Sequence, residues 1–156
     1  MKNKKAIIFD MGGVLVDLDT DGCRNAFKNL LGYYKIDELL DPCHQKGIIG
    51  ELEEGMLGAD EFRSIVLSES APGSLPEDVD KAFHHILGSI SAYKGELLRK
   101  LYESYDLYML SNNNPITMVK AYELFEEVGA PIDRMFRKCF LSCDMKALKP
   151  SEKFYK

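Results

Sequence analysis

The 156-residue sequence has no long hydrophobic run, no paired-cysteine motif, no excess of basic residues and no internal repeat. A membrane-spanning helix needs about 20 apolar residues, and no segment approaches that length. The apolar run 6–9 ends at Asp10 and is too short for a secretory signal. The 25 acidic and 20 basic residues give a net charge of −5, which argues against an electrostatic grip on DNA or RNA. We expect no membrane or nucleic-acid partner.

The composition is that of a soluble globular protein, with 46% hydrophobic and 29% charged residues. At this length we expect one domain, or a core with a modest insertion. The four cysteines show no metal-binding or disulfide-framework spacing, so they are interpreted as reduced thiols. We therefore predict a cytoplasmic protein.

Three short apolar runs predict buried strands, at Lys5–Phe9, Leu107–Leu110 and Lys138–Ser142. Helical patterns follow at 96–104 and 116–128, ahead of the second and third of these runs. Strands that alternate with helices are typical of an α/β protein with a parallel sheet. A further helix is expected after Lys149–Pro150, and Val14–Val16 is expected to be extended.

The stretch 17–92 interrupts this alternation with helical patterns of its own. One apolar stripe surrounds Phe27, and a second surrounds Phe62 with Asp60 as its candidate N-cap. Pro76 is expected to open a third helix that runs on through Ile90. We predict a helical cap at 17–92, inserted into a core formed by 1–16 and 93–156.

Polar residues follow each predicted strand, where parallel sheets bind ligands. They are Asp10, the pair Ser111–Asn112, and Lys149. Each alone is more often an ordinary turn, cap or solvated residue. Their combination at one sheet edge favours a functional site.

Three segments resemble sequence motifs of the haloacid dehalogenase (HAD) superfamily. Ile7–Asp17 resembles motif I, Tyr108–Pro115 resembles motif II and Lys146–Tyr155 resembles motif III. The helices at 17–92 resemble a C1-type cap, and the whole is most similar to the glucose-1-phosphate phosphatase-like branch. The resemblance implies a Rossmann-like, three-layer parallel-sheet core with an inserted helical cap.

The resemblance also implies a chemistry. Asp10 would attack phosphorus and form an aspartyl phosphate, and Lys149 would neutralise charge on Asp10 and on the bound phosphoryl group. The Ser111 hydroxyl and the backbone amides near Asn112, free at a helix start, would hold phosphate oxygens. Magnesium would be held by Asp10 and by the backbone carbonyl of Gly12. The implied function is a magnesium-dependent phosphatase acting on a small phosphorylated metabolite, with a sugar phosphate expected.

Gly12 departs from the superfamily pattern, in which most phosphatases have an aspartate that transfers protons. General acid–base catalysis contributes roughly 10²–10⁴ in rate, so its loss predicts slow turnover, a good leaving group or an acid from elsewhere. Asp17 and Asp19 are nearby candidates. A glycine at position 12 could also serve a positive φ angle.

The acidic pair of motif IV is also missing, because seven residues follow Lys149. We therefore hypothesise a fragment truncated before motif IV, with a core incomplete at its C-terminus. The open edge of the first strand would then favour self-association.

Two other functions stay open beside the phosphatase. One is a catalytically impaired or inactive fragment that serves as an interaction module. The other is a dehalogenase, which the run Met11–Val14 does not match. The cap is expected to select the substrate, and its polar candidates are His44, Glu51, Glu54, Arg63, His84 and His85.

Overall fold

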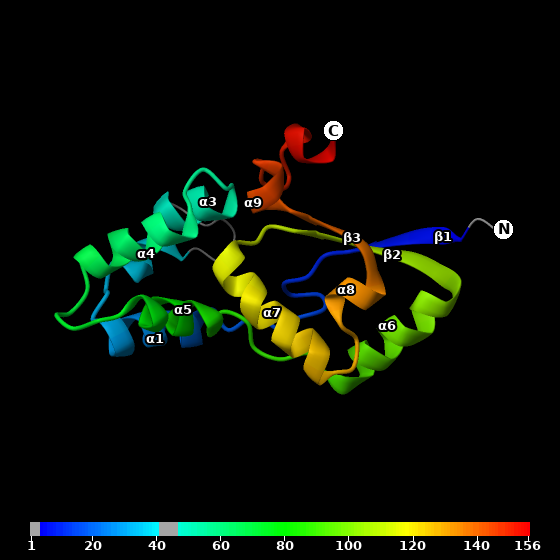
Figure 1. Cartoon of the computed structure of the whole chain (residues 1–156), viewed down its shortest axis with the longest axis horizontal. Helices are drawn as coiled ribbons and strands as arrows, with labels where there is room; N and C mark the ends of the chain where they lie inside the picture. Colours follow the sequence, from blue (N-terminus) through cyan, green and yellow to red (C-terminus); the bar gives the residue numbers. More distant parts are fainter. Residues whose placement is uncertain (1–3, 41–46) are drawn as a thin grey trace.

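A computed structural model describes residues 4–40 and 47–156 of the chain. At its centre is a parallel sheet of three strands in the order β1-β2-β3 (Figure 1). The strands are β1 (Lys5–Phe9), β2 (Tyr105–Ser111) and β3 (Phe136–Leu141). The predicted parallel α/β class is confirmed, although β2 and β3 each begin two residues earlier than the apolar runs indicate.

The register of the strands brings their carboxyl ends to one edge of the sheet. Phe9 lies beside Met109, and Ser111 lies beside Leu141. The residue that follows β1, Asp10, is therefore held next to the end of β2. Among the described residues β1 pairs with β2 alone and forms one edge of the sheet, so self-association through this edge stays a prediction.

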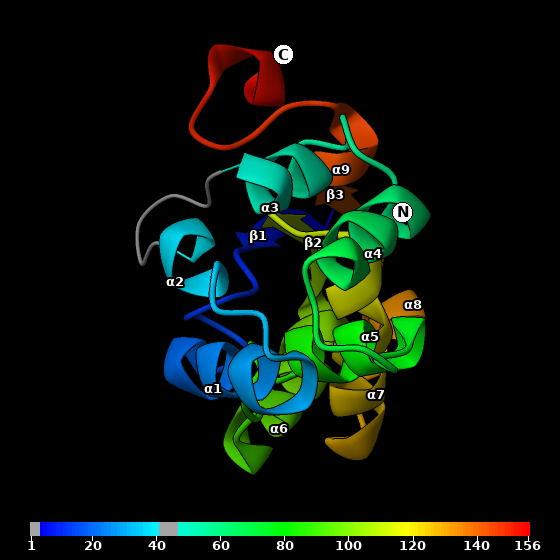
Figure 2. The same cartoon turned by 90° about the vertical axis from the view of Figure 1, so that its left-hand side faces the viewer.

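Helices α6 (Ala92–Ser104), α7 (Pro115–Glu127) and α8 (Ile132–Met135) lie on one side of the sheet in both views (Figures 1 and 2). They bury an apolar cluster against the sheet, in which Phe136 of β3 meets Phe125 of α7 with ring centroids 6.0 Å apart. Burial of this apolar surface stabilises the core, because it removes nonpolar area from water. The helix expected at 96–104 begins earlier, at Ala92.

Five helices between β1 and α6 form a second group, drawn at the left of Figure 1. They are α1 (Thr20–Leu31), α2 (Ile36–Leu39), α3 (Gly47–Glu53), α4 (Ala59–Ser68) and α5 (Pro76–His84). Their interior is a separate apolar cluster, where Phe83 contacts Phe62 at 5.5 Å and Phe27 at 5.8 Å between ring centroids. Aromatic pairs at such separations add to the stability gained by burial.

Several local predictions were wrong at element ends. Helix α4 is capped by Gly58, while Asp60 lies inside its first turn. Helix α5 ends at His84, so the apolar residues around Leu87 belong to the returning chain, which bridges back to Leu18. Leu87 and Ile90 of that return segment belong to the sheet cluster, whereas Ile86 packs against the apolar clusters of both the sheet and the helical group. The periodicity in the sequence continued past the helix end because both segments bury apolar residues.

Two further segments differ from expectation near the sheet. The stretch after Asp10 is a turn closed by a bridge between Gly12 and Val16, not an extended piece. The helix expected after Lys149–Pro150 is a single 3₁₀ turn, η1 (Glu152–Tyr155), and a short helix α9 (Ser142–Met145) directly follows β3. Within the described part of the chain, no helix has both the length and the apolar character needed to cross a membrane.

Candidate active site

A cleft of about 590 Å³ lies at the carboxyl edge of the sheet, where the core meets the helical group. One wall comes from the strand ends and the loops that follow them. The other wall comes from α3, α5 and the two segments that connect the helical group to the core. The residues that line it include Asp10, Gly12, Glu53, Ser111, Asn112 and Lys149.

Asp10 and Lys149 form an ion pair inside this cleft. The Lys149 Nζ lies 2.8 Å from Asp10 Oδ2, and it also donates to the carbonyl of Leu110 at 3.1 Å. The other carboxylate oxygen, Asp10 Oδ1, accepts the backbone N–H of Met11 at 2.8 Å. The Asp10 side chain is 46% exposed and that of Lys149 is 18% exposed, so the carboxylate is reachable from the cleft while the ammonium is held in place. The structure therefore brings together two of the residues that the sequence places at this edge of the sheet.

Asn112 fastens the loop that carries Lys149 to the end of β2. Its Oδ1 accepts the backbone N–H of Lys149 at 2.8 Å, and its Nδ2 donates to the Lys149 carbonyl at 3.2 Å. This two-way contact fixes a loop that is distant in sequence. Phosphate binding at Asn112 was predicted for the backbone amides near it, and it stays a prediction; the side-chain amide is engaged with the lysine loop.

Ser111 lies at the last position of β2 and is buried at the floor of the cleft. Its Oγ makes one long contact, 3.3 Å, to the carbonyl of Asn112. A hydroxyl with such a weak intramolecular bond can turn to donate to an anionic oxygen in the cleft.

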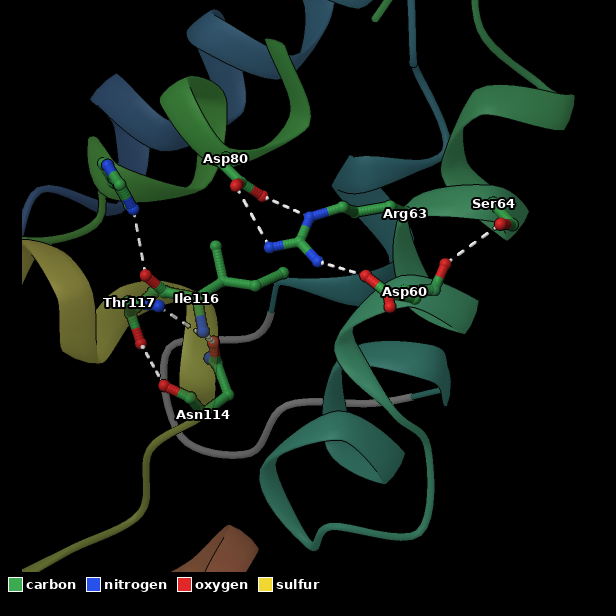
Figure 3. Close-up of polar contacts among 8 residues, drawn as sticks. Asp60, Arg63, Ser64, Asp80, Asn114, Ile116 and Thr117 are labelled. Atoms are coloured by element: carbon green, nitrogen blue, oxygen red, sulfur yellow. Dashed lines mark hydrogen bonds and ion pairs between the residues drawn. The ribbon is translucent and has the colours of Figure 1, made fainter. Parts of the chain in front are cut away.

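The amides at the start of α7 are not free, contrary to the prediction. Asn114 caps the helix, and its Oδ1 accepts from the amides of Ile116 at 3.1 Å and Thr117 at 3.0 Å (Figure 3). The amide of Asn113 donates to Ser142 Oγ at 2.9 Å, and that of Asn114 donates to Asn113 Oδ1 at 2.8 Å. The asparagine run supplies its own caps. These four amides are therefore not available to an anion, whose side-chain partners in the cleft would be Lys149 and Ser111.

Gly12 lines the cleft but does not need to be glycine for its backbone. The left-handed φ of this turn, 74°, belongs to Gly13, so the structural role proposed for position 12 was wrong. A Cβ on Gly12 would first meet the flexible end of Leu18, at 3.3 Å. The consequence of glycine at position 12 is the loss of a chemical function, because glycine has no side-chain group that can carry a proton.

The two acids suggested as substitutes for position 12 are engaged elsewhere. Asp17 pairs with Lys94 at 3.2 Å. Asp19 caps helix α1 by accepting the amide of Gly22 at 2.8 Å. Neither residue lines the cleft.

Glu53, the last residue of α3, lines the cleft and was not among the predicted candidates. Burial raises the pKa of its carboxyl from the ordinary value of 4.5 to about 7. Sequence reasoning missed it because three glutamates occupy 51–54, and helical periodicity does not say which of them faces a cleft.

The predicted polar residues of the cap lie outside the cleft wherever the structure describes them. Arg63 bridges α4 and α5, with its Nε 2.7 Å from Asp80 and its Nη1 2.8 Å from Asp60 (Figure 3). The His84 ring nitrogen Nε2 lies 2.9 Å from the carbonyl of Ile116. The remaining described candidates, Glu51, Glu54 and His85, do not line the cleft. His44 lies outside the described residues.

The donor set of the cleft fits a cation that keeps much of its water. Among the residues described, no group of three or more His, Cys, Asp or Glu side chains is placed to hold a metal. The cleft offers the Asp10 carboxylate and the backbone of Gly12. Magnesium commonly binds through one or two carboxylates, several waters and substrate phosphate, so these oxygens suit it better than a zinc-type cage.

The parallel-sheet fold, with an aspartate–lysine pair in a cleft at its carboxyl edge, defines an α/β protein of the class that binds ligands at the carboxyl ends of its strands. Comparison with known proteins narrows this class, although no family model matches the chain. The chain is 36% identical over 152 residues to D-ribitol-5-phosphate phosphatase of Bacteroides thetaiotaomicron, covering 97% of this chain and 73% of that protein.

Two solved structures share the fold. A HAD family enzyme from Bacteroides thetaiotaomicron, solved with magnesium and inorganic phosphate, is 32% identical with a TM-score of 0.84, covering 96% of this chain and 74% of that one. A HAD-like hydrolase from Porphyromonas gingivalis is 33% identical with a TM-score of 0.82, covering 97% and 73%. The chain belongs to the HAD family of hydrolases.

Proposed function

We propose that the protein is a magnesium-dependent phosphatase that uses Asp10 as its nucleophile. The observation that carries this proposal is the ion pair between Lys149 Nζ and Asp10 Oδ2, 2.8 Å long, inside a cleft large enough for a small metabolite. A carboxylate beside a fixed cation is suited to attack on a phosphate ester, whose negative oxygens repel an unassisted nucleophile.

The residues of the cleft divide this work. A carboxylate oxygen of Asp10 attacks phosphorus and forms an aspartyl phosphate, which water hydrolyses. Lys149 holds the nucleophile in position and balances negative charge on the phosphoryl group. The Ser111 hydroxyl donates to a phosphate oxygen. Asp10 and the Gly12 carbonyl would hold magnesium, which would supply charge neutralisation for the phosphoryl group.

The substrate class we propose is a phosphorylated sugar or sugar alcohol. The relative in Bacteroides thetaiotaomicron is a phosphatase of D-ribitol 5-phosphate. The cleft combines polar strand ends with apolar side chains such as Phe83 and Leu87, which suits a short carbon chain bearing hydroxyl groups. Membership of the glucose-1-phosphate phosphatase-like branch is part of the same proposal.

We also infer that residues 17–92 act as a C1-type cap on a core of 1–16 and 93–156. Two apolar clusters support this division. One joins Met11 and Leu15 to the sheet and to the return segment near Ile90, and the other lies mainly among α1 to α5. A cap of this kind closes the cleft, excludes water and selects the substrate.

An inactive interaction module is the second candidate, and Gly12 is the observation that favours it. Without a proton-transfer group at position 12, the cleft would bind phosphate compounds without turning them over. The two candidates differ in whether Asp10 supports turnover or only binding.

Phosphate release by the purified protein with magnesium tests the proposal, using p-nitrophenyl phosphate, D-ribitol 5-phosphate and glucose 1-phosphate. We expect turnover that falls roughly 10⁴–10⁶-fold in Asp10→Asn, because the nucleophile is removed. The matched control is Asp21→Asn, an exposed carboxylate on α1, which should leave turnover unchanged. Binding of phosphate esters without turnover by the unaltered protein would establish the interaction module instead.

A further inference from the structure

Hydrolysis of an alkyl phosphate needs a proton for the departing alcohol, because an alkoxide is a poor leaving group. This inference rests on the proposed function. The ionisable side chains that line the cleft among the described residues are Asp10, Glu53, Lys149 and Tyr155. Asp10 is the nucleophile of the proposal, and Lys149 uses its protons on Asp10 and on the carbonyl of Leu110. Tyr155 is 61% exposed at the rim.

Glu53 is attached to the reactive end of the sheet through a buried hydroxyl. Ser142 Oγ donates to the Glu53 carbonyl at 2.6 Å and accepts the amide of Asn113 at 2.9 Å. Ser142 has no exposed surface, so these bonds do not compete with water. Glu53, the last residue of α3, is thereby linked to Asn113 in the loop that follows β2.

A second contact holds the same end of α3 against the core. Gly55 has a φ of 72°, and a Cβ on it would lie 2.0 Å from the carbonyl oxygen of Cys143. Lys146 Nζ donates to the Gly55 carbonyl. Only glycine permits so close an approach of the two backbones. Glu53 therefore has a fixed position in the cleft wall, although it belongs to the helical group.

We propose that Glu53 is the general acid and base of this phosphatase, taking the role that Gly12 cannot fill. In the first step an Asp10 oxygen bonds to phosphorus, the bond from phosphorus to the alcohol oxygen breaks, and the Glu53 carboxyl proton passes to that oxygen. In the second step the Glu53 carboxylate takes a proton from water as the water oxygen bonds to phosphorus. The bond from phosphorus to Asp10 then breaks, and phosphate, the Asp10 carboxylate and protonated Glu53 result.

The protonation state of Glu53 suits this role. Burial raises its pKa to about 7, so at neutral pH a large share of the molecules carry the proton that the first step consumes. Charged and titratable groups also lie in the cleft, on or next to α3, and on the elements packed against α3. They are Asp10, Lys149 and Tyr155; Glu51 and Glu54; Asp37 and Glu38 of α2; Asp60, Glu61 and Arg63 of α4; and Cys143 and Asp144 of α9 with Lys146.

The test compares leaving groups in Glu53→Gln, an isosteric change that removes the proton donor. For D-ribitol 5-phosphate and glycerol phosphate we expect kcat/KM, which reports the first step, to fall roughly 10²–10⁴-fold. For p-nitrophenyl phosphate the loss of kcat/KM should be much smaller, because p-nitrophenolate leaves without a proton; kcat can fall on both classes, since they share the second step. Glu54→Gln, one residue along and outside the cleft, is the matched control and should keep the activity of the unaltered protein on both substrate classes.

The pH profile of the unaltered protein gives a second, mutation-free readout. We expect kcat/KM for the alkyl phosphates to decline above about pH 7, as Glu53 loses its proton, with no matching decline for p-nitrophenyl phosphate. Equal losses of kcat/KM on both substrate classes in Glu53→Gln, or an undiminished kcat/KM on the alkyl phosphates, would overturn the role of Glu53 while the Asp10-dependent activity still stood. Absence of Asp10-dependent turnover on every substrate would overturn both proposals together.

Discussion

The two walls of the cleft present carboxylates in opposite electrostatic settings. On the strand-end wall, Asp10 is half-exposed and paired with Lys149 at 2.8 Å. On the wall formed by α3, Glu53 is partly buried, and burial raises its pKa to about 7. The first carboxylate thus faces a cation, whereas desolvation favours the neutral form of the second. One cleft thus holds a candidate nucleophile and a candidate proton donor of the same chemical type.

The two walls also differ in how the positions of their residues are fixed. The strand ends are fixed by the sheet register, which needs no side chain from outside the core. The α3 wall is fixed by contacts to the core at single points, chiefly Ser142 and Gly55. We therefore expect changes of charge on the strand-end wall to alter kcat. On the α3 wall, we expect the loss of a contact to the core to alter stability.

Removal of the cation should produce the largest effect. In Lys149→Met we expect kcat on p-nitrophenyl phosphate to fall roughly 10²–10³-fold, because charge that stabilises the transferring group is lost. Steady-state phosphate release measures it. Lys153→Met is the matched control, since Lys153 is exposed and donates to the carbonyl of Lys146. Equal rates in the two variants would contradict the role given to the strand-end wall.

Titration of Glu53 should couple the stability of the protein to pH. Between about pH 4.5 and 7 the folded protein keeps a proton on Glu53 that the unfolded chain has lost, so the free energy of unfolding falls as pH rises. The contribution reaches at most about 3 kcal/mol. Urea unfolding at pH 5 and pH 8 should show a smaller decline in Glu53→Gln than in the unaltered protein. The same decline in both would mean that Glu53 titrates as it does in water.

The anchor of the α3 wall should be tested by Ser142→Ala. This change leaves the Asn113 amide and the Glu53 carbonyl without their shared partner, so we expect a loss of about 1–3 kcal/mol in stability. Ser64→Ala is the control, because Ser64 is exposed and bonds within its own helix (Figure 3); a change within about 0.5 kcal/mol is expected. Equal melting curves for the two variants would exclude a structural role for the Ser142 bridge.

The smallest effect should come from the ion pairs of Arg63 on the helical group. Arg63→Met removes contacts to Asp60 and Asp80 that are partly exposed, so we expect a loss of about 1 kcal/mol or less. Phosphatase activity should not change, because Arg63 lies away from the cleft. A large loss of kcat in Arg63→Met would mean that the surface formed by α4 and α5 contributes to catalysis. It would then contradict the view that catalysis depends on the two walls of the cleft.

The strand-end wall could be predicted from the sequence, whereas the α3 wall could not. A short apolar strand followed by Asp10, and a later strand followed by Ser111, determine which residues meet once the strands are parallel. Whether Glu53 faces the cleft depends on where α3 packs against the core, and the contacts of Gly55 and Ser142 determine that position. Those contacts join segments far apart in the chain and leave no periodic pattern.

The corrections at element ends have a similar physical origin. Asn114 satisfies the first amides of α7, although an asparagine run before a helix is equally compatible with amides left open for a ligand. Asp60 has the residue type of an N-cap, but the helix begins at Ala59 and its carboxylate pairs with Arg63. Helix ends depend on local competition among polar groups, which sequence patterns do not resolve.

The central claim is that Asp10 accepts the phosphoryl group from the substrate. It is tested most directly by stopping the reaction with acid during turnover of p-nitrophenyl phosphate and locating the phosphoryl group by peptide mass spectrometry. We expect a hydroxylamine-sensitive phosphoryl group on the peptide that contains Asp10, and its absence in Asp10→Asn. Phosphate release with the phosphoryl group on another residue, or undiminished turnover by Asp10→Asn, would contradict this claim.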